Sequence, residues 1–263
     1  MNAPAKESLD ELRPAGMAVG EWRQRLELAA CYRLFDWMGW TELIYNHITL
    51  RVDDPGASSP HYLINPYGLH YAEVTAGNLI KIDSAGNKLG DSPWPVNPAG
   101  FVIHSVIHTA RPDAHCVIHT HTTAGMAVAC KEAGLRSDNF YSAMLCGDVA
   151  YHDFEGITTD PAEQPLLRAS LGGCDILVLR NHGMLVIGRS VPDAFQRGWT
   201  LERACQVQMA SDAMAGPNRA VRPEVLERIP QQRAPMRTGN SKPGQLAFDG
   251  MLRRAGIRYA DLV

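Results

Sequence analysis

Apolar positions recur along the chain with two spacings, and these spacings divide it into helices and strands. Recurrence every three or four residues predicts amphipathic helices, while short apolar runs bounded by turn residues predict strands. The helices predicted in this way span residues 21–38, 98–110, 122–132, 161–171, 191–214 and 245–255. The predicted strands span residues 47–52, 61–65, 79–83, 116–121, 176–179 and 184–187. The first three strands fit a small antiparallel sheet, and the last two fit a hairpin that turns at residues 181–183.

The pattern predicts one large domain with a segment of different composition at each end. A chain of 263 residues can bury a substantial core. We expect a flexible N-terminal tail over residues 1–20, the domain over residues 21–215, and a C-terminal arm with a short helix over residues 216–263. The arm is rich in proline and arginine from residue 216 to residue 244, which predicts extended backbone there.

Charge and cysteine content limit the class of partner and the compartment. The formal net charge is -3, and the interspersed charges form no basic stripe or polybasic patch, which argues against nucleic acid and membrane surfaces and favours a small molecule. The six cysteines are scattered and several lie within apolar runs, which indicates reduced thiols. No apolar segment opens the chain and no run approaches about 18 apolar residues, so we expect a cytoplasmic protein.

Candidate chemistry begins with two histidines at the end of an apolar run. His119 and His121 follow the apolar residues 116–118, and because alternate side chains of a strand share one face, both imidazoles project the same way. Two neutral imidazoles side by side can begin a divalent metal site, and His182 at the predicted hairpin turn is the candidate third ligand. A His-x-His pair alone also occurs without a metal. Its position at the carboxyl end of a strand, before a run of small residues, favours a site.

A set of motifs resembles those of the class II aldolase/adducin family, in the same order, over about residues 21–214. They occupy residues 46–51, 64–68, 110–113, 117–121 and 180–183. The resemblance implies a three-layer α/β/α fold around a central, largely antiparallel sheet, and a homotetramer with active sites between subunits. It also implies that His119, His121 and His182 bind a divalent metal, commonly zinc, although iron or manganese would also suit these ligands. The family's metal is a Lewis acid that stabilises an enediolate formed by breaking a bond next to a carbonyl.

Two departures from the aldolases bear on the reaction. The sugar-phosphate aldolases carry an acidic acid/base residue four positions before the helix histidine, but the residue four positions before His104 is Gly100. In the phosphate-binding loops, small residues are replaced by Asn46, His47 and the Pro-Ala pair at 98–99, which are bulkier or lack an N–H. These departures place the chain nearer the adducin-like branch and argue against a phosphorylated substrate.

Several other side chains are candidates for catalysis or substrate binding. Tyr141 falls near the position from which the aldolases send a tyrosine into a neighbouring subunit's site, so it is the first candidate for proton transfer; ordinary packing is the alternative. His104 is the second catalytic candidate, on a helix face that it shares with His108. The candidate substrate contacts are Asn46, Arg51, Tyr67 and Gly68, although a structural salt bridge would also account for Arg51.

The sequence therefore supports one main functional hypothesis and two alternatives. The main hypothesis is a metal-dependent carbon–carbon lyase, of aldolase or decarboxylase type, acting on a small non-phosphorylated carbonyl or hydroxy-acid substrate through an enediolate or enolate. One alternative is a non-haem iron oxygenase that uses the same three histidines. The other is a non-catalytic, adducin-like binding or scaffold protein, which loss of the carboxylate at residue 100 favours and retention of the three histidines disfavours.

Overall fold

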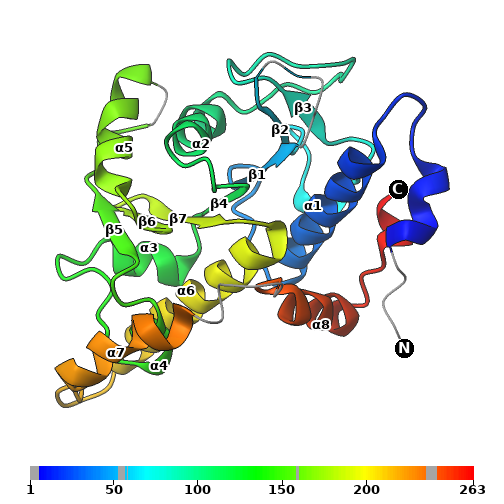
Figure 1. Cartoon of the computed structure of the whole chain (residues 1–263). Helices are drawn as coiled ribbons and strands as arrows, with labels where there is room; N and C mark the ends of the chain where they lie inside the picture. The colour runs from blue at the N-terminus through cyan, green and yellow to red at the C-terminus, as the bar shows by residue number, and fades with distance from the viewer. Residues whose placement is uncertain (1–5, 53–56, 58, 158–159, 235–241) are drawn as a thin grey trace.

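The protein forms a seven-stranded sheet with helices on both faces (Figure 1). The structure is a computed structural model that describes residues 6–52, 57, 59–157, 160–234 and 242–263. The strand order is β3-β2-β1-β4-β7-β6-β5, and every neighbouring pair is antiparallel except β5 and β6. The strands are β1 (His47–Val52), β2 (His61–Ile64), β3 (Ile80–Ile82), β4 (Cys116–Thr120), β5 (Val149–His152), β6 (Ile176–Leu179) and β7 (Gly183–Gly188).

The helices occupy two layers, one against each face of the sheet. Helices α1 (Val19–Trp37) and α6 (Val191–Asp212) cover one face, and α2 (Pro98–Ala110) and α5 (Gln164–Leu171) cover the other. The remaining helices are α3 (Thr123–Ala129), α4 (Phe140–Met144), α7 (Pro223–Arg233) and α8 (Gln245–Ala255), with short 3-10 turns at Lys6–Leu12, Tyr71–Glu73, Pro161–Glu163 and Tyr259–Leu262. The predicted three-layer α/β/α fold with a largely antiparallel sheet is confirmed.

Alternation along β1 explains why the two faces differ in character. Ile48, Leu50 and Val52 belong to the main hydrophobic core, which they share with α1 and α6. The intervening His47 and Thr49 point to the other face, where both hydrogen-bond to histidines of α2. The face under α2 therefore combines a smaller apolar cluster with a set of buried polar side chains.

The two ends of the chain depart from the expected tail and arm. The segment Lys6–Leu12, within the expected tail, forms a 3-10 turn, and the carbonyl of Leu9 accepts a hydrogen bond from Nε1 of Trp22 on α1 at 2.9 Å. Residues 1–5 lie outside the described part. The predicted extended arm is also wrong in part, because residues 223–233 form α7 after a proline at its first position.

The C-terminal helix predicted over residues 245–255 is confirmed as α8, and it is part of the core. Phe248, Leu252, Tyr259 and Leu262 are buried in the same cluster as α1 and α6. No helix within the described residues has both the length and the hydropathy required to cross a bilayer.

Candidate metal centre

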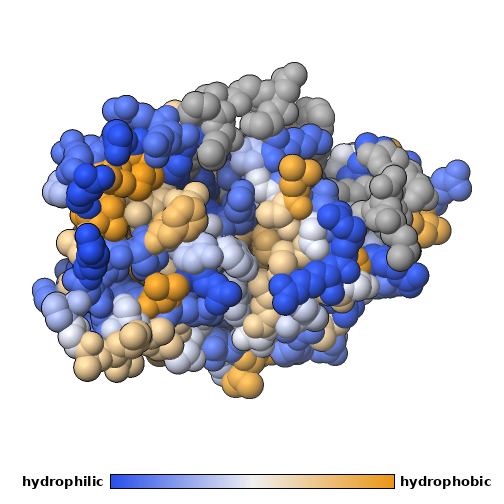
Figure 2. All heavy atoms as spheres, turned by 90° about the horizontal axis from the view of Figure 1, so that it is seen from below, coloured by the Kyte–Doolittle hydropathy of each residue, from blue (hydrophilic) through white to orange (hydrophobic). Residues whose placement is uncertain are grey.

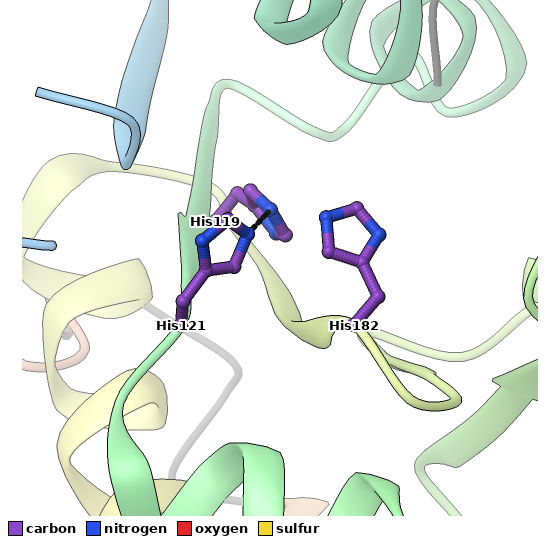
Figure 3. Close-up of side chains that lie close together, drawn as sticks. All are labelled: His119, His121 and His182. Atoms are coloured by element: carbon purple, nitrogen blue, oxygen red, sulfur yellow. Dashed lines mark hydrogen bonds between the residues drawn. The ribbon is translucent and has the colours of Figure 1, made fainter. Parts of the chain in front are cut away.

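Three imidazoles converge beside the end of β4 (Figure 3). His119 lies on β4, His121 follows the strand by one residue, and His182 lies in the turn between β6 and β7. Their possible ligand nitrogens all lie within 4.8 Å of one another, and Nε2 of His119 is 2.7 Å from Nε2 of His121. The structure therefore brings together the three histidines that the sequence predicted as a metal site.

The turn that carries His182 depends on two backbone features. Asn181 adopts a left-handed conformation with φ of 58°, which asparagine tolerates better than most side chains. At Gly183, a Cβ atom would lie 2.5 Å from the carbonyl oxygen of Thr120 and 2.8 Å from Cδ2 of His121. Because real Cβ atoms do not approach backbone so closely, glycine at 183 is what lets the turn come up against the end of β4.

Hydrogen bonds orient the ring of His119 and fix the backbone of His121. Nδ1 of His119 donates to the carbonyl of Met184 at 3.1 Å, which leaves Nε2 with its lone pair toward the other two histidines. The backbone N–H of His121 donates to Oδ1 of Asn46 at 3.1 Å, and the amide group of Asn46 donates to the carbonyl of Trp40 at 3.2 Å. Asn46, predicted as a substrate contact, is buried and fixes the backbone of a ligand.

The protonation state suits metal ligation. Burial lowers the pKa of His119 and of His121, and burial together with the neighbouring His121 and His152 lowers the pKa of His182 to about 4. All three rings are therefore neutral near pH 7, which is the form that binds a metal. Three neutral imidazoles within reach of a single ion fit a divalent metal such as zinc or iron.

A second set of histidines lies next to the three ligands, and it includes the predicted catalytic residue His104. Nε2 of His104 is 2.9 Å from Nδ1 of His47, and the ring of His47 lies 5.0 Å from that of His119, centroid to centroid. Strand pairing produces this arrangement, because His47 on β1 is the register partner of His119 on β4. His104 is therefore linked to the candidate ligands through His47.

His47 also occupies the space in front of Gly100. A Cβ atom at position 100 would lie 2.7 Å from Cδ2, 2.9 Å from Cγ and 3.0 Å from Nε2 of His47. No side chain fits at 100 while the His47 ring stays in place. The absence of an acidic residue at 100 and the presence of a histidine at 47 are thus two parts of one arrangement.

Among the described residues, the contacts of the other predicted residues are with partners other than the three histidines. Arg51 lies four residues beyond His47 along β1, and its guanidinium donates to the carbonyls of His108 and Pro112, so it holds the end of α2. Tyr67 and Gly68 lie on the turn after β2, where Trp94 packs against Gly68. Tyr141 lies on α4, with its ring edge-on to Trp199 of α6 at 5.7 Å, and its catalytic role stays a prediction.

Sequence reasoning missed His47 and Thr49 as members of this cluster. Their signal was available, because a histidine and a threonine alternate with Ile48 and Leu50 in an otherwise apolar strand. Polar residues on the inner face of a buried strand need partners. The partners could not be identified without the packing of α2 on β1.

The fold and the three-histidine cluster together define a protein of class II aldolase type, and comparison with known proteins agrees. The model of the family described as Class II Aldolase and Adducin N-terminal domain matches residues 26–209. This chain belongs to the class II aldolase/adducin family.

The individual relatives include a bacterial aldolase-type protein and a mammalian adducin. A Pseudomonas aeruginosa protein, provisionally named an aldolase class 2 protein, is 41% identical over 241 residues, which cover 91% of this chain and 92% of that protein. Mouse alpha-adducin is 46% identical over 200 residues, which cover 75% of this chain and 27% of that protein. The structure of L-fuculose 1-phosphate aldolase from Glaciozyma antarctica superimposes with a TM-score of 0.77 at 27% identity, covering 95% of this chain and 98% of that one.

Proposed function

We propose that the protein is a metal-dependent carbon–carbon lyase that acts on a small, non-phosphorylated carbonyl or hydroxy-acid compound. The observation that carries this proposal is the convergence of three neutral imidazoles within 4.8 Å at the end of β4, in a chain of class II aldolase fold. His119, His121 and His182 would hold the metal, with zinc proposed first and iron or manganese as substitutes. A divalent metal bound there supplies a Lewis acid that polarises a substrate carbonyl or hydroxyl oxygen.

The residues around the ligands support the choice of a non-phosphorylated substrate. A phosphate group needs several N–H donors or cations. The amide nitrogen of Asn46 donates to the carbonyl of Trp40, and two nitrogens of the Arg51 guanidinium donate to backbone carbonyls at the end of α2, while its Nε has no partner among the described residues. His47 presents a ring where the aldolases carry a small residue. The side chains that this chain places near the centre are thus poorly suited to a dianion.

Proton transfer in this proposal falls to the phenol of Tyr141 from a neighbouring subunit, because position 100 has no carboxylate. The proposal includes a homotetramer with the site between subunits, as the fold family implies. Within one chain Tyr141 packs on Trp199 and makes no ring contact with the three histidines in the described ranges. The six unpaired cysteines support a reducing compartment, and we propose the cytoplasm.

Two alternative functions have an observation in their favour. The identity with mouse alpha-adducin and the glycine at position 100 favour a binding protein that keeps the fold without turnover. The all-imidazole ligand set also suits iron, which favours an oxygenase. The neutral and mutually close state of the three rings favours metal chemistry over the scaffold.

Turnover of defined compounds tests the proposal. Metal-free protein is reloaded with zinc, manganese or iron and supplied with non-phosphorylated hydroxy ketones, 2-hydroxy acids and 2-oxo acids, each beside a phosphorylated counterpart, while carbonyl products and carbon dioxide are measured. We expect cleavage by the loaded wild-type protein and by His70→Ala, whose ring faces Asp36 instead of the centre. We expect no cleavage by His119→Ala. Equal activity of His119→Ala, or none from any loaded wild-type sample, would contradict the proposal.

A further inference from the structure

A chain of four buried polar side chains runs between β1 and α2. From one end, Nδ1 of His108 lies 2.7 Å from the carbonyl oxygen of Ala114, and Nε2 of His108 lies 2.7 Å from the hydroxyl of Thr49. The same hydroxyl lies 2.7 Å from Nδ1 of His104, and Nε2 of His104 lies 2.9 Å from Nδ1 of His47. We call His108, Thr49, His104 and His47 the buried histidine chain; each of the four is 3% exposed or less.

The carbonyl at one end fixes the direction of every hydrogen bond in this chain. A carbonyl oxygen only accepts, so the proton of neutral His108 is on Nδ1 and its Nε2 accepts from the Thr49 hydroxyl. Thr49 has then used its proton, so it accepts from Nδ1 of His104. Nε2 of His104 in turn accepts from Nδ1 of His47. One orientation satisfies all four contacts when the rings are neutral.

Neutral rings are expected because the buried histidine chain contains no carboxylate. A charged imidazole buried without a counter-ion would be costly. Arg51 donates to the carbonyl of His108, and its positive charge opposes protonation of that ring further. Burial accordingly lowers the pKa of His104 and of His108, to about 3 for His108.

The direction of the chain leaves Nε2 of His47 as an unprotonated acceptor at the edge of the candidate metal centre. This nitrogen makes no hydrogen bond within the described ranges, although the ring is 3% exposed. It faces the position of Gly100, where a side chain is absent, and the ring neighbours His119. The buried histidine chain therefore ends on an acceptor that receives no hydrogen bond from the described residues and lies beside the candidate metal centre.

We propose that Nε2 of His47 accepts a hydrogen bond from a hydroxyl group of the substrate held at the three-histidine centre, and that the buried histidine chain fixes the tautomer required for this. The inference rests on the proposed function and narrows its substrate class to compounds with a free hydroxyl group at this position. An unprotonated nitrogen cannot donate to a phosphate oxygen, so the same group selects against phosphorylation there. His104, Thr49 and His108 are positioning residues, because they act through His47.

The tautomers can be measured without substrate or activity. Protein labelled with 15N histidine gives long-range nitrogen–proton spectra that show which ring nitrogen carries the proton, with assignment from single-histidine variants. We expect the proton on Nδ1 and a bare Nε2 in His47, His104 and His108. A proton on Nε2 of His47 would overturn the inference, whatever the reaction of the protein proves to be.

Ligand selectivity tests the role of the acceptor. Zinc-loaded protein is titrated calorimetrically with glycolate and with acetate, which differ by one hydroxyl group. We expect His47→Phe to lower the preference for glycolate about tenfold, the effect of one net hydrogen bond. Thr49→Val breaks the chain at nearly constant volume and should lower the preference in the same direction, whereas Thr49→Ser restores it. An unchanged preference in both His47→Phe and Thr49→Val would overturn the inference.

Failure of the proposed function has a different signature. If neither wild type nor variants take up zinc, the metal-dependent lyase is contradicted, while the nitrogen spectra still decide the state of His47. If zinc binds and glycolate is preferred in wild type and His47→Phe alike, the centre stands and the assigned role of His47 fails.

Discussion

The packing of His47 against Gly100 predicts that Gly100→Ala lowers the free energy of unfolding when the His47 ring is present and raises it when the ring is removed. In Gly100→Ala the new Cβ would start 2.7 Å from Cδ2 of His47, well inside the 3.5–4.0 Å of favourable carbon contacts. The ring cannot easily retreat, because it is buried and bonded to His104. Overpacking of this kind costs about 1–3 kcal/mol, while replacing glycine in a helix gains at most about 1 kcal/mol. We therefore expect a net loss of about 1–2 kcal/mol in the wild-type background.

The His47→Ala background removes the ring and should reverse the sign. There the same Gly100→Ala change keeps its helix benefit without the clash, so it should stabilise by up to about 1 kcal/mol. The coupling energy between the two positions is obtained from urea denaturation of metal-free wild type, Gly100→Ala, His47→Ala and the double variant, provided that the m-value is the same in all four. We expect a coupling energy of about 1–3 kcal/mol. Equal effects of Gly100→Ala in the two backgrounds would refute the argument that His47 excludes a side chain at position 100.

Three further predictions follow from burial and packing. Burial holds the pKa of His47 near 3 and that of His182 near 4, below the unfolded value of about 6.5, so on acidification the unfolded chain takes up protons first. The free energy of unfolding of the metal-free protein should therefore be at its full value above about pH 6.5 and fall toward pH 4 by up to about 1.4 kcal/mol per pH unit for each group. Urea curves that give equal stability near pH 7 and pH 5 would contradict this. Gly183→Ala would place a Cβ 2.5 Å from the Thr120 carbonyl and should weaken zinc binding by at least about tenfold in calorimetry, whereas wild-type affinity would show that the turn tolerates a side chain. Helix α7 buries no side chain and borders a cavity of about 480 Å³ with α4, at the end of the molecule where Figure 2 shows apolar side chains on the surface. Deleting residues 216–234 should therefore lower the assembled mass in size-exclusion chromatography with little change in Tm. An unchanged mass would count against a role of this segment in assembly.

Most elements of the fold could be predicted because their patterns are local. Residues 47–52 and 98–110 were predicted with the observed bounds, since β-branched residues, an N-terminal proline and flanking turn residues mark them clearly. The short helix α4 and strand β5 escaped prediction, because five and four residues give too little periodicity. The 3-10 turn at Lys6–Leu12 is fixed by contacts with Trp22 on α1, which no local pattern reveals.

The candidate site was predictable where residues close in sequence share a face. His119 and His121 follow from strand alternation, and His182 from the hairpin turn together with the family resemblance. The place of His47 beside the ligands depends on the register of β1 against β4. The contacts of His104 with Thr49 and His47 depend on the packing of α2 on the sheet, which brings together residues 55 and 57 positions apart in the sequence. Arg51 shows the opposite case, because the sequence suggested a substrate contact, whereas two nitrogens of its guanidinium donate to backbone carbonyls in the fold.

The central claim is that His119, His121 and His182 hold a divalent metal. Elemental analysis of purified, untagged protein tests it most directly, with His182→Ala and the control His70→Ala measured beside wild type. We predict about one zinc, iron or manganese per chain in wild type and His70→Ala, and its loss in His182→Ala. Wild-type protein that holds no metal and takes none up, or a His182→Ala protein that keeps it, would contradict the account.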